Sequence, residues 1–153
     1  MNAPLSTPAA ASAPQYVLVR ADELRLLLPQ SDVGVAEYLD GALEPLDGAG
    51  LLLNPADAEA SKFYAALSSH MKPLPEAPEG RFLTTTLGDA GDPLHWCWNE
   101  VRVVPGSAIT PLTLPPALRA PYSPITEFAL FEDHVVFLCD AARVTEFAFA
   151  HRT

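Results

Sequence analysis

The stretch WCWNEVRVV, Trp96–Val104, decides the fold together with two later runs, ITEFALF at Ile125–Phe131 and HVVFLC at His134–Cys139. Beta-branched and aromatic residues fill all three runs, and these residue types favour strands. Pro105-Gly106 follows the first run and Glu132-Asp133 separates the other two, as turn residues do. The sequence therefore predicts short strands joined by proline-rich connectors in its last third.

The composition places the chain among globular proteins and bounds its size. A length of 153 residues suits one compact domain or two small lobes that share a core. Of the 153 residues 16 are proline, which is a larger share than the roughly 5% of an ordinary domain. Because proline breaks helices, we expect a mainly β fold with one or two helices rather than a helix bundle.

The charge balance limits the classes of partner. The formal net charge is −10, from 19 acidic and 9 basic residues. Phosphate backbones and anionic lipids would be repelled, and no run approaches the roughly 18 apolar residues of a membrane span. We therefore expect no nucleic acid and no membrane insertion. The acidic surface serves solubility or, as the alternative, steers the protein toward a basic patch on a partner.

The first residues and the cysteines indicate the cellular compartment in which the protein works. Met1–Pro14 is rich in Ala, Pro and Ser and lacks the charged start of a secretory signal, so we expect a disordered leader over residues 1–14. Cys97 and Cys139 lie in apolar strand-like runs and fit buried thiols in a reducing compartment. A disulfide or redox pair is the alternative. These features favour a cytoplasmic protein.

The first half of the chain begins with a hairpin pattern. Gln15–Arg20 alternates polar and apolar residues, and Leu24–Leu28 returns as a second apolar run, so the two predict a β-hairpin. Ser31 then serves as the N-cap of a short helical turn. This turn would place Val35, Tyr38 and Leu39 on one helical face.

A longer helix is expected near residues 55–71. Asn54-Pro55 is a helix start, because Asn caps orphan amides and Pro is pre-set for the first helical position. The proline-rich segment Leu74–Gly80 then suggests a boundary between a first lobe, residues 15–80, and a second β lobe, residues 81–149. Arg81–Leu87 predicts a Thr-rich strand, and Ala141–Phe149 a short closing helix. The stripe that supports the long helix consists of Ala60, Phe63, Tyr64, Leu67 and Met71.

The residues that carry chemistry form no recognisable motif. There is no phosphate-binding glycine loop, no zinc-protease motif and no nucleophile elbow. His95 and Cys97 share one strand face, but a zinc site needs three or four protein ligands. A triad assembled from a cysteine, His134 and Asp140 is conceivable, yet a turn and a strand-ending cap explain the last two. We expect no catalytic residue, no metal and no cofactor. Trp96 and Trp98 share the opposite face, as core between the lobes or as partner anchors.

The order of these pieces resembles a CheW-like domain, the adaptor fold of bacterial chemosensory systems. LLLPQSDVGVAEYL at Leu26–Leu39 resembles the segment that follows the family's opening strand pair. WCWNEVRVV resembles a later strand, and ITPLTLPP at Ile109–Pro116 the long connector. ITEFALFEDHVVFLCDAARV at Ile125–Val144 is similar to the closing strand pair with its aspartate, here Asp140. The family's central Asn-Leu-Arg-Gly strand is missing, and Trp98-Asn99 stands where the family has Val-Asp.

The resemblance implies two small SH3-like β-barrel lobes packed on a shared core, with the first lobe altered. It implies a non-catalytic adaptor that joins a histidine kinase to a chemoreceptor-like protein in a chemosensory or pilus-linked array. It places Val33 and Val35 near the receptor-facing groove, and the helical-face argument adds Tyr38 as a partner-binding candidate. Two alternatives stay open. One is a small ligand-binding or enzymatic β-barrel that uses His95 and Cys97, and the other is a degenerate domain with a structural role.

Overall fold

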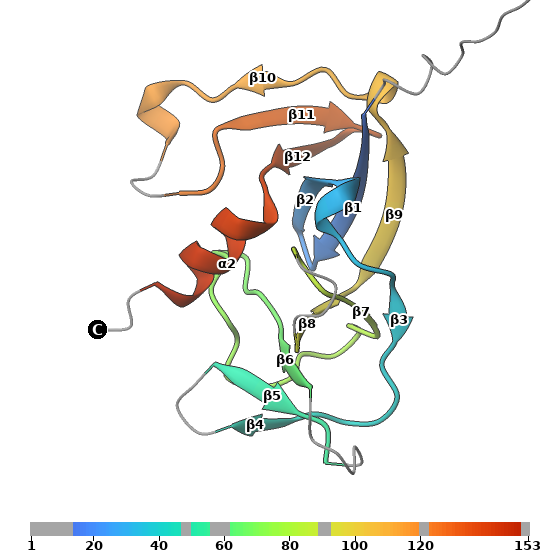
Figure 1. The fold of residues 1–153 in the computed structure, drawn as a ribbon. Helices are drawn as coiled ribbons and strands as arrows, with labels where there is room; N and C mark the ends of the chain where they lie inside the picture. The colour runs from blue at the N-terminus through green and yellow to red at the C-terminus, as the bar shows by residue number, and fades with distance from the viewer. Residues whose placement is uncertain (1–13, 47–49, 56–61, 89–92, 120–122, 151–153) are drawn as a thin grey trace, which may run out of the picture.

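The computed structural model describes residues 14–46, 50–55, 62–88, 93–119 and 123–150, which fold into two six-stranded sheets and one α-helix (Figure 1). Sheet 1 has the order β10-β11-β12-β2-β1-β9, and sheet 2 the order β3-β7-β8-β6-β5-β4. The mainly β expectation is confirmed. Within the described residues neither sheet closes into a barrel, because each has two open edges.

The elements have the following bounds. Sheet 1 contains β1 (Gln15–Ala21), β2 (Leu24–Pro29), β9 (Glu100–Pro105), β10 (Leu112–Thr113), β11 (Glu127–Phe131) and β12 (His134–Leu138). Sheet 2 contains β3 (Glu37–Tyr38), β4 (Glu44–Leu46), β5 (Leu51–Leu53), β6 (Phe63–Ala65), β7 (Leu83–Thr85) and β8 (Leu94–Trp98). The helix is α2 (Ala141–Phe149), and three 3₁₀ turns are η1 (Gln30–Asp32), η2 (Gly106–Ala108) and η3 (Pro116–Leu118).

The chain builds sheet 2 as an insertion into sheet 1. It leaves sheet 1 after β2, forms β3 to β8, and returns to sheet 1 at β9 (Figure 1). Residue 80 falls between β6 and β7, which belong to the same sheet. The two sheets therefore do not divide the chain at residue 80. The disordered leader expected over residues 1–14 lies outside the described residues, apart from Pro14.

Both expected hairpins are confirmed. In β1–β2, Ala21 pairs with Leu24 across a two-residue turn. In β11–β12, Phe131 pairs with His134, and Glu132 and Asp133 have φ angles of 52° and 68°. Two consecutive positive φ angles are what a type I′ turn requires, and this turn matches the twist of the strands that it joins.

The prediction of one strand over Trp96–Val104 is wrong, because β8 and β9 belong to different sheets. Asn99 separates them. Its backbone N–H donates to the Arg20 carbonyl at 2.8 Å, and its side-chain amide donates to the Gly80 carbonyl at 3.0 Å. The Asn99 side-chain oxygen accepts from the backbone N–H of Asp22. The chain thus crosses from sheet 2 to sheet 1 at a residue whose polar groups contact both sheets.

The helix expected near 55–71 is also wrong where the chain is described. Residues 63–65 form β6, which pairs in parallel with β8, and Met71 has a φ of 65° in a turn. Residues 56–61, including Ala60, lie outside the described residues. The physical reason is burial on both faces: Tyr64 packs in one core cluster while Ala65 and Leu67 pack in another. The short helix from Ser31 is likewise replaced by η1 and a strand ladder, and no side-chain cap is present at η1.

Alternation along the strands produces three apolar clusters. Leu18 and Leu27 face a cluster inside sheet 1, and Leu52 and Cys97 face one inside sheet 2. The neighbours of these residues in sequence face a third cluster between the sheets, the shared core. Trp96 and Trp98 lie in it, 1% and 0% exposed, which confirms the core reading for both indoles. The shared core also contains Val17, Val19, Leu24, Leu26, Leu28, Ala65, Leu67, Val144 and Ala148.

The short closing helix is confirmed as α2, which covers the shared core beside β12 (Figure 1). Asp140, expected as a strand-ending cap, is the N-cap of this helix: its Oδ1 accepts from Arg143 N at 2.9 Å. Asp32 adds a second cap from η1, since its Oδ2 accepts from Ala141 N at 3.0 Å. At the other end, Lys72 Nζ donates to the Phe147 carbonyl at 2.6 Å. Both helix ends are therefore held by residues from earlier in the chain.

Candidate functional site

An open apolar depression of about 320 Å³ lies between β9 of sheet 1 and the segment before β3 of sheet 2. Five of its lining residues are valines, and we call it the valine groove. Its lining consists of Val17, Val33, Val35, Val101 and Val103 with Gln30, Gly34, Ala36 and Arg102. Two of the three sequence-derived candidates, Val33 and Val35, line this groove, whereas Tyr38 lies outside it.

A β-bulge shapes the sheet 2 side of the groove. Val33 bridges Leu87, and Glu37 pairs with Thr84. The chain therefore advances four residues on one side of the ladder and only three on the other. One extra residue is therefore accommodated at Val35-Ala36, and a bulge of this kind turns a side chain out of the ladder. Val35 is 85% exposed as a result.

Gly34 is required by close packing beside the bulge. Its N–H donates to the Thr86 carbonyl at 2.9 Å, and a Cβ at this position would collide with the Thr86 hydroxyl. A larger residue fits here only if the Thr86 side chain moves.

The sheet 1 side of the groove is the outer edge of β9. Val101 and Val103 pair with Val19 and Val17 of β1, so they share the face that carries the shared core. Val103 is 52% exposed. Solitary exposed valines are common, but a groove with valines on both walls marks a surface suited to an apolar partner.

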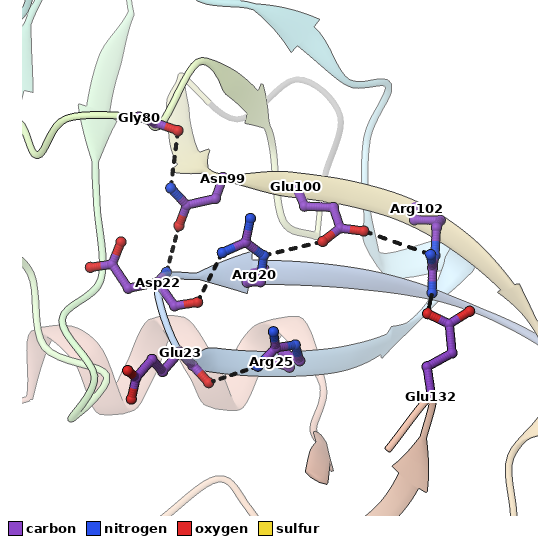
Figure 2. A network of polar contacts seen from close by, with 9 residues as sticks. All are labelled: Arg20, Asp22, Glu23, Arg25, Gly80, Asn99, Glu100, Arg102 and Glu132. Atoms are coloured by element: carbon purple, nitrogen blue, oxygen red, sulfur yellow. Dashed lines mark hydrogen bonds and ion pairs between the residues drawn. The ribbon is translucent and has the colours of Figure 1, made fainter. Parts of the chain in front are cut away.

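A chain of charged groups borders the groove at Arg102 (Figure 2). Arg102 bonds Glu132 at 2.7 Å and lies 3.9 Å from Glu100, which in turn bonds Arg20 at 3.1 Å. The hydrogen bond that Arg102 donates to Glu132 and the attraction of both carboxylates raise the pKa of Arg102 above its ordinary value. The guanidinium is therefore charged and held at the groove margin by the β11–β12 turn.

A second polar junction joins the sheets behind the groove. Arg81 has a side chain that is 1% exposed, donates to the Leu67 carbonyl at 2.7 Å and pairs with Asp22 at 3.0 Å. Its Nε has no hydrogen-bond partner. Asn99 links the same Asp22 turn to Gly80 (Figure 2).

An enzymatic β-barrel that uses His95 and Cys97 would need a reactive thiol or a metal site in this region. Burial raises the pKa of the Cys97 thiol to about 12, and the Arg81 charge lowers it by less. The His95 ring lies 5.8 Å from the Tyr64 ring at a tilt of 38°. Among the described residues no group of three or more His, Cys, Asp or Glu side chains is placed to hold a metal ion. A neutral, buried thiol is a poor nucleophile and a poor ligand.

Cys139 and His134 do not converge with these residues. Cys139 packs against the shared core, away from the sheet 2 cluster that contains Cys97, and both cysteines are free. Burial raises the pKa of Cys139, and the charges of Asp140 and Asp32 add to this. His134 is exposed in the β11–β12 hairpin, so it does not form a buried triad with Asp140, which caps α2.

Sequence reasoning missed the β9 wall of the groove and Gly34. The alternation Val101-Arg102-Val103 is visible in the sequence and marks two valines on one strand face. What the sequence did not show is that β9 is an edge strand of sheet 1 and lies opposite Val35.

No helix among the described residues combines the length and apolar character needed to cross a bilayer. Neither a scan against protein-family models nor a search of curated proteins finds a match for this chain.

Proposed function

We propose that this protein is a non-catalytic interaction module, an adaptor of CheW type that docks an apolar segment of a partner in the valine groove. The observation that carries the proposal is the groove itself, with Val33 and Val35 on one wall and Val101 and Val103 on the other. Apolar pockets that bury a partner's anchor side chain supply most of the energy of such interfaces.

The arrangement of the apolar clusters supports the adaptor reading. Each sheet encloses a cluster of its own, and a third cluster lies between them. We interpret the sheets as two SH3-like lobes on a shared core, with the first lobe altered relative to the CheW pattern. The partners are a histidine kinase and a chemoreceptor-like protein, in the cytoplasm, where free thiols such as Cys97 and Cys139 persist.

The test is affinity capture from native lysate with identification of the captured proteins by mass spectrometry. Val35→Asp and Val103→Asp place a charge in the groove without disturbing the core, because both positions are more than half exposed. Loss of an anchor contact reduces affinity about 30-fold. Val135→Asp is the matched control, since Val135 is 46% exposed on β12, and it does not line the groove.

The expected result is capture of a histidine kinase or a chemoreceptor by the native protein and by Val135→Asp, but not by the two groove variants. Capture of neither class of protein, or capture that all three variants retain equally, would refute the proposal.

A further inference from the structure

The edge of sheet 2 at β3 carries an unprotected backbone. Of the four edge strands described, β4 contains Pro45, β9 ends at Pro105, and β10 follows Pro111. Proline at or beside an edge strand removes a main-chain donor and so hinders the pairing of another chain there. β3, at Glu37–Tyr38, has no proline within it or beside it.

The register shows which backbone groups are available at this edge. Leu39 N–H donates to the Phe82 carbonyl at 2.7 Å, and Glu37 pairs with Thr84. Successive residues of an antiparallel strand direct their N–H and C=O groups to opposite sides. The N–H and C=O of Tyr38 therefore point away from β7, toward solvent, and the Tyr38 side chain is 82% exposed.

A pocket of about 270 Å³ lies beside this edge on the Leu39 and Phe82 face. We call it the edge pocket. Its apolar walls suit an aliphatic side chain, and burial keeps the Cys97 thiol in the wall neutral. A strand paired with Tyr38 would alternate its own side chains, so the neighbours of the residue opposite Tyr38 would face this pocket. The lining consists of Leu39, Gly41, Ala42, Leu43, Ala77, Pro78, Phe82 and Cys97, together with the buried Arg81.

The exposed charges around the edge pocket are mostly negative. Residues 37–44 and 76–82 contain five exposed carboxylates and one cation, Arg81, which is buried. One cation lies at this rim, since Lys62 Nζ is 3.8 Å from Glu37 and offsets part of its charge. An extended segment that approaches here meets a negative rim. The carboxylates are Glu37, Asp40, Glu44, Glu76 and Glu79.

We propose that β3 accepts a basic, extended segment of a partner protein as an added strand, with an aliphatic side chain in the edge pocket and Lys or Arg side chains against the acidic rim. Added strands of this kind gain affinity from main-chain hydrogen bonds and specificity from pockets for alternate side chains. The inference goes beyond the proposed function, because it concerns a second surface that shares no lining residue with the valine groove.

The experiment uses a labelled seven-residue peptide that alternates Lys with Val or Leu, titrated against the native protein in a fluorescence anisotropy assay at low salt. Two control peptides are matched in length. One has Glu in place of each Lys, and the other has an N-methyl group on the central residue, which removes one main-chain donor and leaves the protein unchanged. Amide hydrogen exchange of Tyr38 is followed in parallel.

Binding of the basic peptide is expected, with slower exchange at the Tyr38 amide. The N-methyl peptide and the Tyr38→Pro variant should each bind about tenfold more weakly, as the loss of a main-chain hydrogen bond without replacement implies. Tyr38→Ala retains the N–H and should lose about threefold, the contribution of a cation near an exposed ring. The peptide with Glu should not bind.

Several outcomes would overturn the proposal. These are equal binding of the acidic and basic peptides, no effect of N-methylation, and no change in Tyr38 exchange. Concentration-dependent self-association that Tyr38→Pro abolishes would show a second copy as the occupant instead. Val103→Asp separates the two surfaces: it should abolish capture through the valine groove and leave peptide binding within about twofold, as expected of distant sites.

Discussion

The contact between Arg81 and Asp22 joins the two sheets, and a double-mutant cycle on this pair measures what the junction contributes to stability. Arg81→Met keeps the length of the side chain and removes its charge. Asp22→Asn keeps the shape of the side chain and removes the counter-charge. The third variant carries both substitutions, and the quantity compared is the free energy of unfolding.

The magnitude for Arg81→Met follows from two opposing effects. The buried Leu67 carbonyl loses its donor, which costs about 1–3 kcal/mol. Against this, the variant no longer buries a guanidinium whose Nε lacks a partner. The net loss of stability is expected to be about 1–2 kcal/mol.

The magnitude for Asp22→Asn depends on exposure. Removing one partner of a fully buried ion pair costs about 3–5 kcal/mol, whereas an exposed pair contributes about 0–1 kcal/mol. Arg81 is buried but the Asp22 side chain is 60% exposed, so water compensates part of the loss. We expect about 1–2 kcal/mol, between the two limits.

The coupling between the two changes is the decisive quantity. Once the guanidinium is gone, Asp22→Asn should cost less than about 0.5 kcal/mol, which leaves a coupling of about 1 kcal/mol. Urea unfolding followed by the fluorescence of the buried Trp96 and Trp98 provides the assay. The matched control is the exposed pair Arg102 and Glu132, for which a coupling below about 0.5 kcal/mol is expected.

The reasoning would be refuted if Asp22→Asn had the same cost with and without Arg81. Such additivity would mean that the carboxylate and the guanidinium do not interact energetically, and that the shared core holds the sheets together without this junction. An Arg81→Met variant more stable than the native protein would show that the desolvation cost of the guanidinium exceeds the contribution of its hydrogen bonds.

Three further predictions concern single side chains. Because the pKa of Cys97 is raised to about 12, its contribution to stability is complete below the unfolded thiol's pKa and is lost above it. Urea unfolding at pH 7.5 and 10.5 should show the native protein losing about 2 kcal/mol more than Cys97→Ala, and an equal loss would contradict the assignment. Asp32→Ala removes the cap on Ala141 N and should lower unfolding stability by about 1 kcal/mol, whereas Asp32→Asn should retain most of it. Gly34→Ala forces a methyl group against Thr86 and should cost about 1–3 kcal/mol in thermal unfolding, with an unchanged melting temperature as the contrary result.

The hairpins could be predicted from sequence because their signals are local. Gln15–Arg20 alternates, Glu132-Asp133 supplies turn residues, and each strand pairs with its neighbour in the chain. The α2 helix is similar, since Asp140 is a good N-cap and Val144 and Ala148 lie four residues apart. In each case the physical cause lies within about ten residues of the element.

The failures have a common cause in contacts with residues that are distant in sequence. Phe63, Tyr64 and Leu67 match a helical stripe, but they also match a strand whose two faces meet different clusters. The break at Asn99 depends on its contacts with Arg20 and Gly80, which are distant in sequence. A local pattern cannot distinguish these cases, because it does not contain the neighbouring sheet.

The candidate surfaces show the same division between local and distant causes. The ladder from Val33 to Leu39 contributes to both: its bulge turns Val35 into the valine groove, and its regular end leaves the Tyr38 backbone open at the sheet edge. The sequence-derived set of Val33, Val35 and Tyr38 therefore joins residues of two surfaces, since a helical face was assumed where a bulged strand exists. A bulge moves every later side chain by one position relative to the partner strand. Deleting Ala36 should restore a regular ladder and move Val35 out of the valine groove. Capture of the partner through the groove should then weaken, whereas the edge at Tyr38 should still bind the basic peptide.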